Sequence, residues 1–212
     1  MSRVAAILLA SVAAASCRSG RAVAGPPILQ PGPPGEPTHA IAVEQAVDLS
    51  RVQFTAADVQ FMQGMIGHHA QAVEMVALVP SRSRRETMRL LALRIDVSQA
   101  DEIRMMRRWL EVRGQALPDP HAHHAHDATL MPGMLTAVEM DLLTKLKGDE
   151  FDRLFLEGMI KHHEGALTMV RDLFSVGGAG QESEMFAFAA DVDADQRMEI
   201  ERMGAMLQEL QP

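Results

Sequence analysis

Residues 58–76 read DVQFMQGMIGHHAQAVEMV, and residues 152–170 read DRLFLEGMIKHHEGALTMV. Aligned without a gap at an offset of 94, these two segments are identical at ten of their nineteen positions. A weaker repeat follows at an offset of 97, where Asp96, Gln99, Glu102, Ile103, Met106 and Leu110 match Asp193, Gln196, Glu199, Ile200, Met203 and Leu207. The chain therefore contains one structural unit twice.

The repeated segments have helical periodicity. Apolar residues recur at helical spacing, and Ala, Leu, Met and Glu dominate a chain that has seven Phe, one Trp and no Tyr. We predict long helices from Thr55 to just before Pro80, from near Ser83 to Gly114, over 149–174 and over 182–210, with a short helix over 136–147. Two helix hairpins cannot bury their apolar faces alone, so we expect an all-α, antiparallel four-helix bundle built from two repeated hairpins.

Residues 1–17 have the features of a signal peptide. Arg3 precedes an unbroken run of apolar or small residues over 4–15, which is too short to span a bilayer. The run ends at Cys17 and resembles a bacterial lipoprotein signal, although Ala14 stands where Leu is usual. We expect export to the periplasm or the cell-envelope membrane surface, with Cys17 lipidated. The alternative is an ordinary secretory signal that is cleaved nearby.

Residues 18–50 are rich in Pro and Gly and should form a disordered tether, followed by the duplicated domain over 51–212 with a His- and Met-rich connector over 115–135.

Composition limits the partners. The formal net charge of −8 and the lack of a long basic run exclude nucleic acid. A single Cys excludes an internal disulfide. The membrane would be contacted through the lipid anchor only, homodimer formation stays open, and no protein partner is indicated.

The repeated Met-Ile-x-His-His motif predicts a metal site. On a helix with 100° per residue, Met65, His68 and His69 share one face, and Met159, His162 and His163 share the equivalent face in the second copy. If the two faces meet, four imidazoles and two thioethers converge. Imidazole with thioether favours copper, especially Cu(I), while zinc and iron remain open.

Carboxylates near the histidines allow other interpretations. Asp58, Asp152, Glu102 and Glu199 could orient metal-bound imidazoles, act as alternative ligands, or accept imidazole protons in a metal-free network. A di-iron carboxylate site needs Glu three residues before His, whereas Met65, Ile66, Met159 and Ile160 occupy those positions. Met106 and Met203 are better explained as core residues than as ligands.

The connector holds a second group of candidate ligands. They are His121, His123, His124, His126, Met131 and Met134. Histidine-rich tracts bind metal ions with modest selectivity, and a solvated loop without metal is an equally good explanation.

The segments FMQGMIGHHAQAVEMV, MPGMLT and FDRLFLEGMIKHHEGALTMV resemble the family grouped as domain of unknown function 305, exported bacterial proteins related to a cyanobacterial periplasmic copper-binding protein. The resemblance covers roughly residues 55–210 and implies a ferritin-like four-helix bundle with copper bound at the Met-Ile-x-His-His residues. Gly67 stands where the family often has Pro.

The leading hypothesis is a non-enzymatic envelope protein that binds and sequesters copper for homeostasis or tolerance. The alternatives are a ferritin-like, metal-dependent oxidoreductase with Asp58, Glu102, Asp152 and Glu199 as ligands, and a metal-free helical adaptor for an envelope partner.

Overall fold

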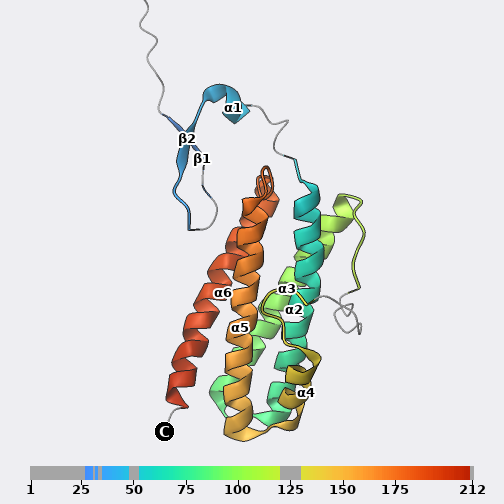
Figure 1. Cartoon of the computed structure of the whole chain (residues 1–212), viewed down its shortest axis with the longest axis vertical. Coiled ribbons are helices and arrows are strands. Elements are labelled where there is room, and N and C mark those ends of the chain that lie inside the picture. Colours follow the sequence, from blue (N-terminus) through green and yellow to red (C-terminus); the bar gives the residue numbers. More distant parts are fainter. Residues whose placement is uncertain (1–26, 31, 33–34, 48–52, 120–129, 211–212) are drawn as a thin grey trace, which may run out of the picture.

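A computed structural model describes residues 27–30, 32, 35–47, 53–119 and 130–210. Four long helices dominate it, and they are α2 (Ala56–Arg82), α3 (Glu86–Val112), α5 (Gly148–Ser175) and α6 (Ser183–Glu209). The short helix α4 (Ala137–Lys145) precedes α5, as Figure 1 shows. The prediction of an all-α helical bundle made of two helix hairpins is confirmed, while the ferritin-like relationship stays a prediction.

The helix boundaries follow local capping chemistry. Thr55 and Asp58 form a capping box at the start of α2, because the Thr55 side chain accepts from the Asp58 N–H and Asp58 accepts from the Thr55 N–H. The prediction that this helix stops before Pro80 was wrong, since α2 continues to Arg82. A proline in the last turn removes only one N–H donor, and the Ser83 N–H still closes the helix on the Val79 carbonyl.

The tether also differs from its prediction where it is described. Strands β1 (Ile28–Gln30) and β2 (His39–Ile41) pair in antiparallel register, and α1 (Val43–Val47) follows. The Gln30 side chain donates to that of Gln181 at 3.0 Å, which holds this hairpin against the turn between α5 and α6 (Figure 1). Backbone pairing and this contact supply order that a Pro- and Gly-rich composition does not reveal. The leader, with Cys17, lies outside the described residues.

The core divides into two apolar clusters. One contains the first half of α2 and the second half of α5, with Phe61, Met65 and Val170 among its members. The other contains the second half of α2 and the first half of α5, with Met75 and Met159. The histidines lie between the two clusters, so a polar layer crosses the middle of the bundle.

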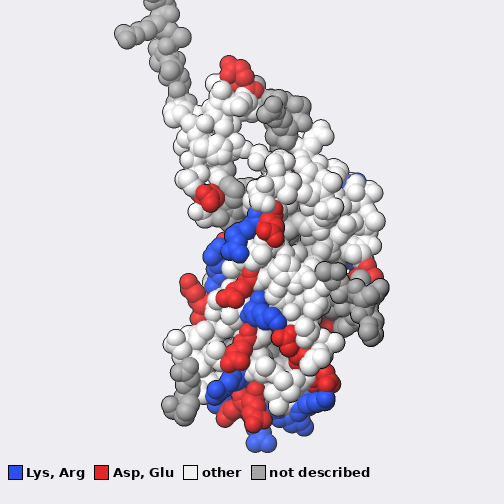
Figure 2. Space-filling model, in the orientation of Figure 1, with Lys and Arg blue, Asp and Glu red and all other residues white. Residues whose placement is uncertain are grey.

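The outer surface carries charges of both signs. On the face in Figure 2, acidic and basic side chains alternate along the bundle, whereas the part around the hairpin is largely uncharged. Within the described ranges, no helix combines the length and the apolar character that a membrane span requires.

Candidate metal site

The repeated histidines meet halfway along the bundle. His68 and His69 lie on α2, His162 and His163 lie on α5, and the two helices pack against each other in opposite directions. All four imidazoles are at most 1% exposed. The two copies of the motif therefore face each other, which the repeat by itself could only suggest.

On each of α2 and α5, one histidine contacts a glutamate of a neighbouring helix. His69 Nε2 lies 2.5 Å from Glu102 Oε2 on α3, and His163 Nε2 lies 2.7 Å from Glu199 Oε2 on α6. Because an ionised carboxylate only accepts, the neutral form of each ring carries its proton on Nε2 and its lone pair on Nδ1. A carboxylate that fixes the tautomer of a ligating histidine is a common feature of metal sites.

The other two histidines stack on each other. The rings of His68 and His162 have centroids 3.9 Å apart at an interplanar angle of 39°. His68 Nε2 also lies 2.9 Å from the Pro132 carbonyl oxygen, to which it donates. On each helix the two neighbouring rings are 6.3 Å apart (His68 and His69) and 6.2 Å apart (His162 and His163). The layer thus contains a stacked central pair with one His–Glu pair on each side.

This environment keeps His162 neutral. Burial lowers its pKa well below the ordinary value, and charge on His68, His163 or His69 would lower it further. A neutral imidazole has a lone pair and can therefore bind a metal ion at neutral pH.

The layer has unused lone pairs. Within the described part of the chain, Nδ1 of His69 and Nδ1 of His163 are buried and meet no partner in hydrogen-bond geometry. Buried polar atoms without partners are costly in a folded protein. A Lewis acid would satisfy these nitrogens, so the donor set fits a metal ion that prefers imidazole.

The side chains are not arranged as a complete coordination sphere. Among the residues that the structure describes, no three His, Cys, Asp or Glu side chains are grouped closely enough to hold a metal ion. A metal binds in the plane of an imidazole, so stacked rings such as His68 and His162 would have to rotate to share an ion.

The thioethers do not converge as the sequence predicts. Met65 lies in one apolar cluster with Met106, and Met159 lies in the other with Met203. All four are fully buried. The antiparallel crossing of α2 and α5 causes this separation, because residues three positions before each His–His pair point to opposite ends of the bundle.

The connector crosses the histidine layer. Gln71 donates to the Leu135 carbonyl at 2.9 Å and accepts from its N–H at 2.7 Å. A Cβ at Gly165 would lie 2.0 Å from the Pro132 carbonyl oxygen, so the connector backbone rests directly on α5. Sequence reasoning missed Gln71 and Pro132, because neither is an obvious ligand and both act only through the tertiary contact.

The structure describes two of the six candidate ligands in the connector. Met131 Sδ lies 3.3 Å from the position that a Cβ on Gly64 would occupy, one helical turn before His68, and Met134 is buried. His121, His123, His124 and His126 lie outside the described residues.

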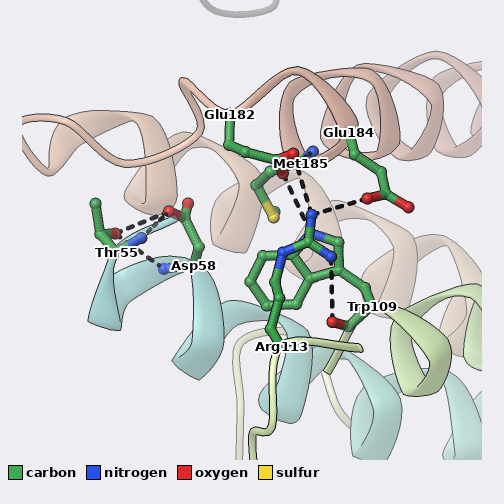
Figure 3. A network of polar contacts seen from close by, with 7 residues as sticks. All are labelled: Thr55, Asp58, Trp109, Arg113, Glu182, Glu184 and Met185. Carbon is green, nitrogen blue, oxygen red and sulfur yellow. Dashed lines mark hydrogen bonds and ion pairs between the residues drawn. The ribbon is translucent and has the colours of Figure 1, made fainter. Parts of the chain in front are cut away.

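Asp58 and Asp152 are not placed for metal binding. Asp58 accepts from the N–H of Gly180 at 2.7 Å in addition to capping α2 with Thr55 (Figure 3). Asp152 Oδ2 lies 3.4 Å from Arg85 Nε at the turn between α2 and α3. Each is ten residues before its histidine, which is roughly 15 Å along a helix. The prediction that they orient or replace ligands fails on this distance, and they join helix ends instead.

Comparison with known families identifies one whose model spans both copies of the repeat. A family model described as a domain of unknown function, DUF305, matches residues 58–207. The fold is similar to that of a DUF305 fragment from Deinococcus radiodurans, with 34% identity, a TM-score of 0.63, and coverage of 74% of this chain and 98% of that chain. It is also similar to a DUF305 protein from Streptomyces coelicolor predicted to be secreted, with 32% identity, a TM-score of 0.62, and coverage of 73% and 93%.

Copper-bound structures are among the similar ones. CopM in its Cu(I)-bound form shares 25% identity with a TM-score of 0.59, over 76% of this chain and 100% of that chain. CopM in its Cu(II)-bound form shares 26% identity with a TM-score of 0.60, over 73% and 97%. No curated protein matches the chain.

Proposed function

The chain belongs to the DUF305 family, and on that premise we propose that it binds and sequesters copper in the cell envelope, without catalysing a reaction. The observation that carries the proposal is the pair of buried His–Glu contacts, His69 with Glu102 and His163 with Glu199, which leave Nδ1 of each imidazole without a partner. The similarity to copper-bound CopM supports the choice of ion.

His69 and His163 act as ligands through Nδ1, and His162 and His68 join them after rotation of the stacked rings. Met65 and Met159 enter only if their side chains turn from the two apolar clusters toward the histidine layer. Methionine is flexible, so this rearrangement is feasible for a soft ion such as Cu(I). The number of imidazoles, rather than the thioethers, sets the affinity in this proposal.

A competition titration with Cu(I), Cu(II) and Zn(II) against chelators of known affinity tests the proposal on residues 40–212. The variant H68Q/H69Q/H162Q/H163Q should lose tight Cu(I) binding while circular dichroism shows the same helical content. The matched control H121Q/H123Q/H124Q/H126Q removes as many imidazoles from the connector and should keep tight binding. An unchanged affinity in the first variant would contradict the proposal.

An oxidoreductase is the second candidate, because Glu102 and Glu199 bring carboxylates next to His69 and His163. Iron would be its metal. Oxygen consumption or peroxide turnover by the iron-loaded wild type, lost in E102Q/E199Q, would replace the copper proposal with this one.

We also propose that the protein is anchored to a membrane through lipidated Cys17, as its leader predicts. Radiolabelled palmitate should label the wild type and not C17S. The C17S chain should leave the membrane fraction while remaining exported. Equal labelling of both would remove the anchor from the proposal.

A further inference from the structure

The buried histidines need a path to solvent. On one side the connector covers them, because His68 donates to Pro132 and Gln71 forms two hydrogen bonds with Leu135. On another side, α2 and α5 pack on each other. The remaining approach is between α3 and α6, which belong to different hairpins.

A cleft of about 320 Å³ opens between α3 and α6. The residues that matter for its chemistry are Asp101, Glu102 and Met105 from α3, and Asp191, Ala194 and Asp195 from α6. Four carboxylates and one thioether thus line a single cavity. Met105 is 53% exposed, so a soft donor is available at its mouth.

Glu102 connects the cleft to the histidine layer. It lines the cleft although it is only 9% exposed, and its Oε2 lies 2.5 Å from His69 Nε2. His69 is fully buried behind it, with Nδ1 free of any partner in the described residues. An ion in the cleft is therefore separated from the His69 ring by one side chain, with Nε2 as the ring nitrogen that faces Glu102.

Carboxylates outnumber the cationic side chains around the cleft. Burial raises the pKa of Asp195, the negative charges of Glu102, Glu199 and Asp191 raise it further, and the positive charge of Arg94 lowers it. Arg94 Nε lies 3.5 Å from Glu199 Oε1, and Arg104 pairs with Asp101. A cleft with excess negative charge and low-dielectric walls concentrates cations.

We propose that the cleft between α3 and α6 is the entrance through which a copper ion reaches the buried histidines, with Asp101, Asp191, Asp195 and Met105 as its first contacts. This inference rests on the proposed function. It adds a route by which the ion reaches the histidines and a transient site at the entrance of that route. Glu102 takes part in both, because it lines the cleft and contacts His69.

Stopped-flow measurements on the full domain test the route. Ala194→Phe fills the cleft without changing charge, and it should slow copper association and dissociation by the same factor while the equilibrium Kd stays unchanged. A blocked route affects both directions equally, whereas a damaged site changes Kd. Rates equal to those of the wild type would overturn the route and leave tight copper binding, and thus the proposed function, intact.

The carboxylates have their own test. D101N/D191N/D195N should lower the association rate at low salt by about tenfold or more, and the loss should shrink as salt is added. The matched control E150Q/E157Q/E164Q makes the same change in charge on exposed residues of α5. Equal effects of the two variants would show that the association rate depends only on the net charge of the protein, and this result would overturn the role of the cleft.

Mn(II) provides a test that does not depend on copper binding. Paramagnetic broadening of amide signals should concentrate at Asp101, Asp191 and Asp195, and it should disappear in D101N/D191N/D195N. A wild type that binds no copper but shows this broadening would remove the proposed function and keep the cleft as a cation site. Broadening that is equal at Glu150, Glu157 and Glu164 would overturn the cleft.

Discussion

At the scale of single residues, the His–Glu contacts explain why the buried imidazoles are available to a metal. Glu102 and Glu199 fix the proton on Nε2 of His69 and His163, so that Nδ1 keeps its lone pair. A solvent-exposed histidine would exchange tautomers freely. Burial therefore makes the choice of hydrogen-bond partner decisive for binding.

Replacing these two glutamates should weaken copper binding. E102Q/E199Q keeps the side-chain shape but removes the charge that orients the imidazoles, so Cu(I) affinity should fall by about 10- to 100-fold. The competition titration measures it, with E111Q/E201Q as a control on exposed positions of the same two helices. Equal affinities in the two variants would contradict the orienting role.

A second residue-scale prediction concerns the contact between the connector and α5. Gly165→Ala places a Cβ 2.0 Å from the Pro132 carbonyl oxygen, so the connector must shift and the free energy of unfolding should fall by about 1–3 kcal/mol. Chemical denaturation measures this change. Gly204→Ala is the control, because no atom lies within 4 Å of its added Cβ on α6, and it should stabilise by about 0.5–1 kcal/mol. Stabilisation by both substitutions would refute the close contact.

At the scale of elements, the end of α3 is tied to the start of α6. Glu182 accepts from Trp109 Nε1 at 3.3 Å, from the Met185 N–H at 3.0 Å and from Arg113 Nη2 at 3.1 Å (Figure 3). The Arg113 guanidinium also lies 4.3 Å from the centre of the Trp109 ring. Since α3 and α6 belong to different hairpins, this cluster joins the two repeats at the end of the bundle where α2 begins.

This cluster predicts a pH dependence of stability. Burial alone would raise the pKa of Glu182, but the hydrogen bonds from Trp109 and Met185 and the charge of Arg113 lower it below its ordinary value of 4.5. A lower pKa in the folded state means that protonation favours unfolding. The stability advantage of the wild type over E182Q should be complete above pH 4.5 and disappear as the pH falls through the folded-state pKa. Urea unfolding of both chains between pH 3 and pH 7 measures it, and a constant difference would contradict the assignment.

At the scale of the whole molecule, the antiparallel packing of the two repeats places a polar layer between two apolar clusters. Each cluster combines opposite halves of the two repeats, because the first half of α2 packs with the second half of α5 in one cluster and the reverse holds in the other, so each hairpin contributes to both. Buried polar groups without partners in the middle layer reduce the stability of the metal-free chain. An ion that binds there would join all four helices through His69, His163 and their glutamates.

Copper should therefore stabilise the whole domain. At a free Cu(I) concentration of 100 times Kd, the free energy of unfolding should rise by about 2.7 kcal/mol, and a strong Cu(I) chelator should reverse the gain. Thermal unfolding in chelator-buffered Cu(I) measures the shift in Tm. The H68Q/H69Q/H162Q/H163Q variant should show no shift, and a shift equal to that of the wild type would assign the stabilisation to another site.

The repeat, the helical periodicity and the doubled His-His motif determined the fold class and the candidate imidazoles, because local spacing decides which side chains share a helix face. Only the tertiary structure decided which partners those side chains meet. It paired His69 and His163 with Glu102 and Glu199, separated Met65 from Met159, and moved Asp58 and Asp152 to the ends of the bundle. The physical reason is that α2 and α5 run in opposite directions. Equivalent residues therefore lie at the same level only near the middle of the two helices, and residues before or after that point lie toward opposite ends of the bundle.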